Sequence, residues 1–196
     1  NISNNFISEQ LSHCLFCVSG TESITISSFT FRENDLIDKK LSSFELFSVE
    51  SPSELLFIKK STIENNKIFL SLYTSSIFFG LKFATFVIVE DSMFLSLSFF
   101  ADVGQLLFFS FGKEQNSLVI ISSCTFKNFT ASSELKFIFM HLNSEKALIT
   151  KNIFSLNRMS NPGSTLFGFE GGGVAILYSI FEGNLFGFTS FFHSYR

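Results

Sequence analysis

A phenylalanine or isoleucine recurs along this chain at intervals close to thirty residues. These positions, called anchors here, are Ile2, Phe31, Ile63, Phe94, Phe126, Phe154 and Phe181. The intervals between them are 29, 32, 31, 32, 28 and 27 residues. A period in this range is typical of repeat architectures, in which each unit stacks on the next. It predicts that one supersecondary unit is repeated along the whole chain.

Aliphatic residues occupy two fixed positions before the anchors. Five residues before, only β-branched side chains are found: Ile26, Ile58, Val89, Ile121, Ile149 and Ile176. Their restricted χ1 angles suit a pleated strand better than a helix. Two residues earlier stand Ile24, Leu56, Val87, Val119, Ala147 and Val174. Because a spacing of two puts side chains on one face of a strand, both positions are predicted to face the core.

Asparagine stands three residues after most anchors. Five repeats carry it, as Asn5, Asn34, Asn66, Asn157 and Asn184. Leu97 and Phe129 replace it in the other two. An amide both donates and accepts hydrogen bonds, and Asn tolerates turn geometry, so stacked copies can bond from coil to coil. Two residues before the anchor, mostly small or polar residues predict a bend.

These patterns predict two or three short strands in each repeat, separated by bends and without sustained helical periodicity. A unit of this length cannot cover its own apolar face, so its neighbours must stack on it. We therefore expect an all-β fold, a parallel β-helix (solenoid) wound by a single chain in about six coils of 27–32 residues. Residues 1–196 are expected to form one continuous solenoid.

The composition fits a stacked core and narrows the class of partner. The chain has 30 phenylalanines and no tryptophan, and stacked aromatic rings fill a long, narrow interior. Its formal net charge is −3 without a long run of either sign, which argues against a nucleic-acid surface. A mean hydropathy of +0.35 keeps membrane contact open as an alternative. However, the longest interval without a charge, 68–81, is too short for a spanning helix.

The three cysteines, Cys14, Cys17 and Cys124, do not decide the redox compartment. Cys14 and Cys17 have the spacing of a redox motif or of half a zinc site, but no second pair completes such a site. The favoured interpretation is that all three are packed core thiols. A disulfide or a metal site is the alternative.

Short motifs in the chain resemble those of a known family. A Gly-Gly-Gly-Val-Ala-Ile run at 171–176 precedes Phe181-Glu-Gly-Asn184, and Phe31 and Phe154 begin similar Phe-x-x-Asn motifs. Together they resemble the glycine-glycine-alanine-isoleucine and phenylalanine-x-x-asparagine repeats of polymorphic outer-membrane proteins. They are also similar to repeats in large β-helical surface proteins of unicellular eukaryotes. The resemblance implies a right-handed, pectin-lyase-like β-helix outside the cell, used in adhesion or as surface structure.

Catalysis is not predicted, although related β-helices include polysaccharide lyases and hydrolases. Such chemistry needs paired carboxylates, or a carboxylate cluster that holds calcium, near a cationic residue. The chain has four aspartates, and no acidic residues are predicted to stack in adjacent coils. His13, His141 and His193 fall in different coils. We therefore expect no catalytic residues, no metal site and no cofactor.

The leading hypothesis is a non-catalytic extracellular or cell-surface structural protein that assembles end to end into a fibre. The chain begins on an anchor and has no initiator Met, so we expect part of a longer polypeptide or a filament protomer. Its partners would be copies of itself or the rest of that polypeptide. If it is secreted by a eukaryote, two sequons predict N-glycosylation, at Asn128 and less favourably at Asn1.

The second hypothesis is an adhesin or carbohydrate-binding module, and the third is a polysaccharide lyase or hydrolase. Exposed aromatic side chains would favour the second, because sugars bind to aromatic surfaces. Four residues that fall outside the repeat positions are candidates: Tyr73, Phe100, Phe108 and Tyr178.

Overall fold

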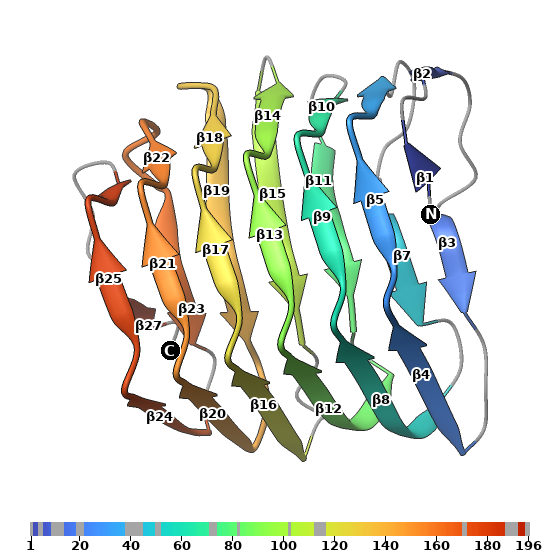
Figure 1. The fold of residues 1–196 in the computed structure, drawn as a ribbon. Coiled ribbons are helices and arrows are strands. Elements are labelled where there is room, and N and C mark those ends of the chain that lie inside the picture. The colour runs from blue at the N-terminus through green and yellow to red at the C-terminus, as the bar shows by residue number, and fades with distance from the viewer. Residues whose placement is uncertain are drawn as a thin grey trace.

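The computed structural model of the chain is a stack of short parallel strands (Figure 1). It describes residues 2–3, 6–8, 14–18, 22–37, 45–49, 52–70, 74–81, 83–101, 103–111, 117–169, 172–186 and 192–194. All elements of regular secondary structure in these ranges are β-strands. The ranges contain no helix that is long and apolar enough to cross a membrane. The fold is an all-β parallel β-solenoid, as the repeat predicts.

Four sheets run along the solenoid, and each turn adds one strand to each of them. Sheet A consists of β1 (Ile2–Ser3), β5 (Thr30–Arg32), β9 (Thr62–Glu64), β13 (Met93–Leu95), β17 (Thr125–Lys127), β21 (Ile153–Ser155) and β25 (Ile180–Glu182). Sheet B consists of β2 (Phe6–Ser8), β6 (Asp35–Ile37), β10 (Lys67–Leu70), β14 (Ser98–Ala101), β18 (Thr130–Ala131), β22 (Arg158–Met159) and β26 (Leu185–Phe186).

Sheet C consists of β3 (Cys14–Val18), β7 (Glu45–Val49), β11 (Thr74–Gly80), β15 (Gly104–Ser110), β19 (Leu135–Leu142), β23 (Thr165–Phe169) and β27 (Phe192–Ser194). Sheet D consists of β4 (Ser23–Ser27), β8 (Ser53–Lys59), β12 (Ala84–Glu90), β16 (Leu118–Ser122), β20 (Lys146–Thr150) and β24 (Gly173–Leu177). The described chain makes about five turns, slightly fewer than the six coils expected.

The anchors of all seven repeats lie opposite one another in sheet A. The register pairs each anchor with the next, from Ile2 with Phe31 through to Phe154 with Phe181. Sheet D pairs the β-branched residues in the same way, from Ile26 with Ile58 through to Ile149 with Ile176. The rings of Phe94, Phe126, Phe154 and Phe181 stack at 4.9–5.0 Å, close to the strand spacing. The phenylalanine content is thus accounted for by columns that run along the solenoid.

Each turn contains four strands where the sequence predicts two or three. Single residues with positive φ break the chain between sheets D and A and again between sheets A and B. They lie three residues before and two residues after the anchors: Ser28, Glu33, Lys60, Asn65, Asp91, Ser96, Ser123, Asn128, Lys151, Leu156, Tyr178 and Gly183. We call them kink residues. Each corner needs only one residue with positive φ, so the sequence has no loop-like stretch that would separate these strands.

The kink residues are held by the turn that follows. In each of the ten kinks before the last turn, the N–H group of the kink residue donates to a carbonyl of the next turn, at 2.9–3.2 Å. Ser28 donates to Lys59, for example, and Leu156 to Glu182. A left-handed conformation costs most residues about 1–2 kcal/mol. This bond is therefore part of what fixes a Ser, Lys or Leu in a conformation that glycine prefers.

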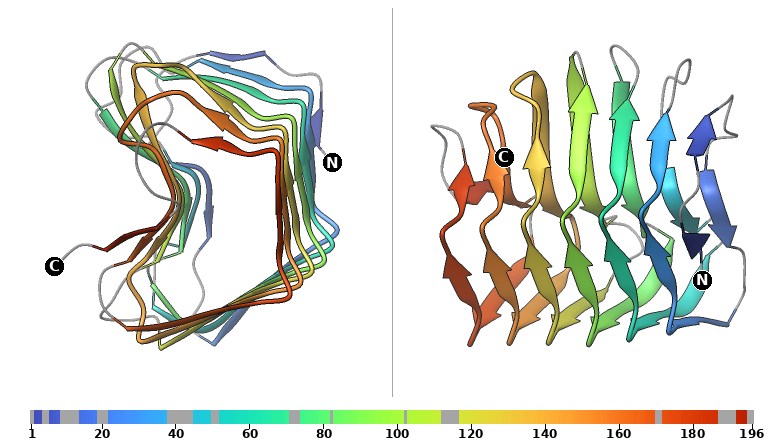
Figure 2. Two further views of the ribbon diagram at one scale, coloured as in Figure 1. Left: turned by 90° about the vertical axis from the view of Figure 1, so that its left-hand side faces the viewer. Right: turned by 45° about the horizontal axis from the view of Figure 1, so that its top comes forward.

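Sheet C bows toward the other sheets, so that the cross-section has one concave side (Figure 2). In β15, the neighbours Phe108 and Phe109 are both fully buried, and both rings contact Phe94, with centroid distances of 5.6 and 5.7 Å. Phe78 and Phe79 of β11 are likewise both buried. Adjacent strand residues normally face opposite ways, so the strands bulge at this point. The expectation that Phe108 is an exposed aromatic is wrong for this reason.

Candidate functional site

The asparagine column forms a ladder of hydrogen bonds between turns. The amide oxygen of Asn66 accepts from both the N–H and the Nδ2 group of Asn34, at 2.9 and 3.0 Å. The Nδ2 group of Asn66 donates back to the anchor carbonyl of Phe31, at 3.0 Å. Each amide therefore clamps two backbone groups of the preceding turn, on both sides of its kink residue. Asn5 lies outside the described residues.

The same clamp recurs near the C-terminal end. Asn157 accepts from the N–H of Phe129 at 3.0 Å and donates to the carbonyl of Phe126 at 3.1 Å. Asn184 accepts from the N–H and Nδ2 groups of Asn157, at 3.1 and 2.8 Å, and donates to the carbonyl of Phe154 at 2.7 Å. Leu97 and Phe129 stand in the asparagine column, but their side chains cannot accept a hydrogen bond from the preceding turn. The amide ladder is therefore interrupted between Asn66 and Asn157.

A second polar ladder lies two residues before the anchors, directly after the other kink. Side-chain oxygens of Ser92, Asn152 and Ser179 accept the N–H groups of Ser61, Cys124 and Asn152, at 3.1, 2.9 and 3.3 Å. Asn152 also donates to the carbonyl of Ile121 at 2.8 Å. The small or polar residues of this column predict a bend, and in the structure they also bond one turn to the next. Its polar character is the signal that indicates a hydrogen-bonded ladder.

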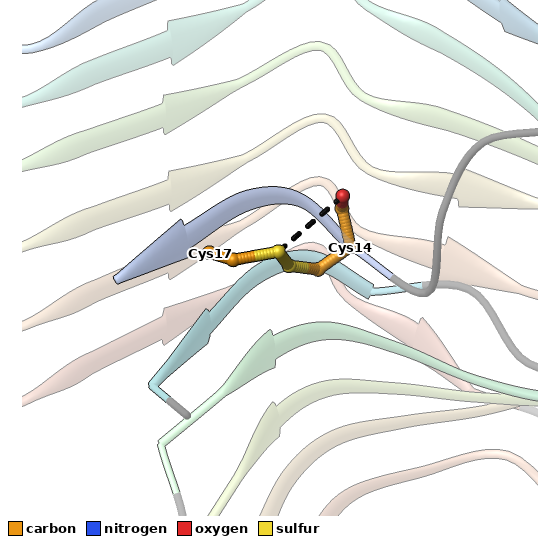
Figure 3. The surroundings of a disulfide bond; sticks show 2 residues. All are labelled: Cys14 and Cys17. Atoms are coloured by element: carbon orange, nitrogen blue, oxygen red, sulfur yellow. Dashed lines mark hydrogen bonds between the residues drawn. A yellow bond between two sulfur atoms is a disulfide. The ribbon is translucent and has the colours of Figure 1, made fainter. Parts of the chain in front are cut away.

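The cysteines occupy two different environments. Cys14 and Cys17 of β3 form a disulfide, with their Cα atoms 5.7 Å apart (Figure 3). The favoured interpretation of packed thiols is therefore wrong for this pair. Cys124 is a free, buried thiol in the second ladder, and burial raises its pKa to about 12. Its Sγ donates to the carbonyl of Ser122 at 3.2 Å, so it substitutes for the serine of neighbouring turns.

Two inward-facing side chains of the last described turn are more exposed than their counterparts in the turn before. Phe181 is 36 % exposed, whereas the anchors Phe126 and Phe154 are 0 % exposed. Val174 is likewise 36 % exposed, against 4 % for Ala147 in the turn before. Leu177, Tyr178, Ile180 and Leu185 add further exposed apolar surface nearby. We call this surface, formed by β24, β25 and β26, the open end.

Backbone donors accompany these apolar side chains at the open end. The kink residues of the last turn are Tyr178 and Gly183. Their N–H groups have no acceptor among the described residues, although the ten preceding kink residues all donate to a following turn. The open end thus carries core side chains and kink donors in the arrangement that a further turn would complete.

The other predicted site residues are spread over the surface. Asn128 is exposed at a kink with φ 60°, and its Nδ2 donates to Ser96 Oγ at 3.2 Å, so its amide is accessible for modification. Asn1 and the aromatic candidate Tyr73 lie outside the described residues. Tyr178 is 84 % exposed and Phe100 is 40 % exposed. Phe100 stacks on Phe69 at 4.8 Å, which covers one ring face of each.

Side chains suited to metal binding are not gathered in the described part of the chain. Among those residues, no group of three or more His, Cys, Asp or Glu side chains is placed to hold a metal ion. His141 lies in β19 of sheet C, and Arg32 and Arg158 lie in sheets A and B. The candidate functional site with the clearest chemistry is therefore the open end.

Comparison of the chain with protein-family models, curated proteins and solved structures gave no match. What the structure establishes is the parallel β-solenoid itself. The resemblance to polymorphic outer-membrane proteins rests on the motifs alone, and within the described turns those motifs have a structural explanation. Phe is the stacked anchor, the second variable residue is the kink, and Asn clamps the preceding turn.

Proposed function

We propose that this chain is a non-catalytic structural protein whose solenoid continues end to end into a fibre at the cell surface or outside the cell. The observation that supports this most directly is the open end, where core side chains are partly exposed and two kink donors have no acceptor among the described residues. The turn that covers it would come from another copy or from the rest of a longer polypeptide. Right-handed winding, as in polymorphic outer-membrane proteins, is part of the proposal.

Covering Val174 and Phe181 adds apolar burial to association. A fully buried apolar side chain contributes about 1.5–3 kcal/mol, and each of these two is 36 % exposed, so burying the remainder contributes about 1–2 kcal/mol for both together. Immobilising two partners costs about 4–15 kcal/mol, so the backbone hydrogen bonds of the added strands are needed as well as this burial. The kink donors then favour one register, because they find acceptors only when sheets A, B and D align with those of the added turn.

The disulfide supports the extracellular location. Disulfides persist in oxidising environments and are rare in reducing ones. Cys14 and Cys17 are paired within one strand. Glycosylation at Asn128 and contact with glycans are further predictions for such a location.

Sedimentation velocity and negative-stain imaging test this proposal. The isolated chain is expected to form species that lengthen with concentration and keep the width of one solenoid. A double variant, Val174→Lys with Phe181→Lys, places two charges on the open end and is expected to remain monomeric. Ile153→Lys is the control, since Ile153 is 39 % exposed and belongs to β21, in the turn before the open end.

Two results would contradict the proposal. One is a wild-type chain that stays a monodisperse monomer at all concentrations. The other is assembly by the double variant to the same extent as Ile153→Lys. Far-UV circular dichroism of each variant establishes that the solenoid is folded before the comparison is made.

A further inference from the structure

An apolar cavity that is partly open to solvent lies among the first turns of the solenoid, near the end opposite the open end. Its volume is about 390 Å³. β3 of sheet C forms one wall, and Ile26, Leu46 and Ile63 from the following strands belong to the others. Pockets that hold small molecules typically measure about 300–1,000 Å³. The cavity therefore has the size of a ligand site.

Side-chain size in two inward-facing columns explains why space remains here. In the turns anchored by Phe94 and Phe126, the anchor ring meets a second ring from sheet C: Phe94 meets Phe108 at 5.6 Å, and Phe126 meets Phe139 at 5.1 Å. The turn anchored by Phe31 has Leu46 at the sheet C position, and the next turn has Ile63 as its anchor. Each of these two successive turns lacks one of the two rings, and both smaller side chains line the cavity.

The lining determines the chemistry of what could occupy this space. No charged side chain is found among the described residues that line the cavity. The hydroxyl of Ser61 is directed to the carbonyl of Lys59, at 3.2 Å. A bound water makes two to four hydrogen bonds, and the described lining offers it few polar partners. Five phenylalanines belong to the lining instead: Phe16, Phe29, Phe47, Phe79 and Phe94.

We propose that this cavity is a binding site for a small, uncharged, apolar molecule, such as a hydrocarbon chain or an aromatic ring compound. Such a ligand gains by leaving water and by contacting side chains that otherwise face empty space. The lining residues come from β3 and the turns that follow it, so none of them belongs to the open end. The protein would then carry an apolar cargo inside a structural scaffold.

The uncharged fluorophore N-phenyl-1-naphthylamine provides the test. The wild-type chain is expected to bind it at a single saturable site, with a rise in fluorescence and in melting temperature. Ile63→Phe places in the cavity the ring that neighbouring anchors carry, and it is expected to abolish this saturable binding. Leu46→Phe fills the second position and is expected to do the same, so the test stands if one of the two variants fails to fold.

Two controls separate the cavity from other apolar surfaces. Ile153→Phe makes the same change at an exposed position of sheet A and is expected to bind the probe as the wild type does. Val174→Lys alters the open end and is expected to leave the saturable site intact. Absence of saturable binding by the wild type overturns the proposal. So does wild-type binding by folded Ile63→Phe and Leu46→Phe, or loss of binding in Val174→Lys alone.

Discussion

Replacing Asn157 by alanine is expected to destabilise the solenoid by about 3 kcal/mol. The fully buried side chain makes three hydrogen bonds: from Phe129 N–H at 3.0 Å, to the carbonyl of Phe126 at 3.1 Å and to Asn184 Oδ1 at 2.8 Å. Each buried hydrogen bond contributes about 1 kcal/mol net, so losing all three lowers the free energy of unfolding by about 3 kcal/mol. Alanine offers no polar atom that could replace them.

Urea unfolding followed by far-UV circular dichroism measures this difference. Asn128→Gly is the matched control, because Asn128 is exposed, makes one side-chain bond at 3.2 Å and has a φ of 60° that glycine adopts freely. Its effect is expected to stay within about 0.5 kcal/mol, as for most surface substitutions. If Asn157→Ala costs no more than this control, the amide clamp does not stabilise the stack of turns.

Three further predictions test the core, the kinks and the buried thiol. Phe126→Asp buries a charge among aromatic rings and is expected to abolish the β-sheet circular dichroism; a folded variant would contradict the anchor register. Leu156→Gly removes a strained conformation at φ 56° and is expected to raise the free energy of unfolding by about 1 kcal/mol, whereas Leu185→Gly in β26 lowers it. The pKa of Cys124 rises from about 9 to about 12 on folding, so its stabilising contribution is complete below pH 9 and is lost as the pH rises toward 12. Unfolding measured across this range is expected to show the decline in the wild type and to show less of it in Cys124→Ala.

The period and the core columns could be predicted from sequence because like residues must stack on like residues. Phe154 and Phe181 are 27 residues apart in the chain and stack at 4.9 Å, so a spacing visible in the sequence becomes a contact. The asparagine column was visible for the same reason, since Asn157 and Asn184 are bonded directly.

The kinks and the bulge could not be predicted, because the backbone at these points is imposed by the neighbouring turns. Lys60, Leu156 and Tyr178 all have positive φ, and none of these residue types favours it. They are recognised only by their place in the repeat, three residues before or two residues after an anchor. Phe108 was expected outside because it does not fall on a column, but the bulge in β15 turns it inward.

The direction of the kink donors gives the two ends of the solenoid different chemistry. Every kink N–H that has a partner donates toward the C-terminal side, so at the kink positions the C-terminal end presents donors and the opposite end presents acceptors. Copies that join through such ends do so head to tail, without a two-fold axis. A head-to-tail contact that does not close into a ring can repeat without limit. The interface would therefore set the polarity of a fibre but not its length. Ending the fibre would need a separate component that binds one end of the solenoid and offers no second end for another copy.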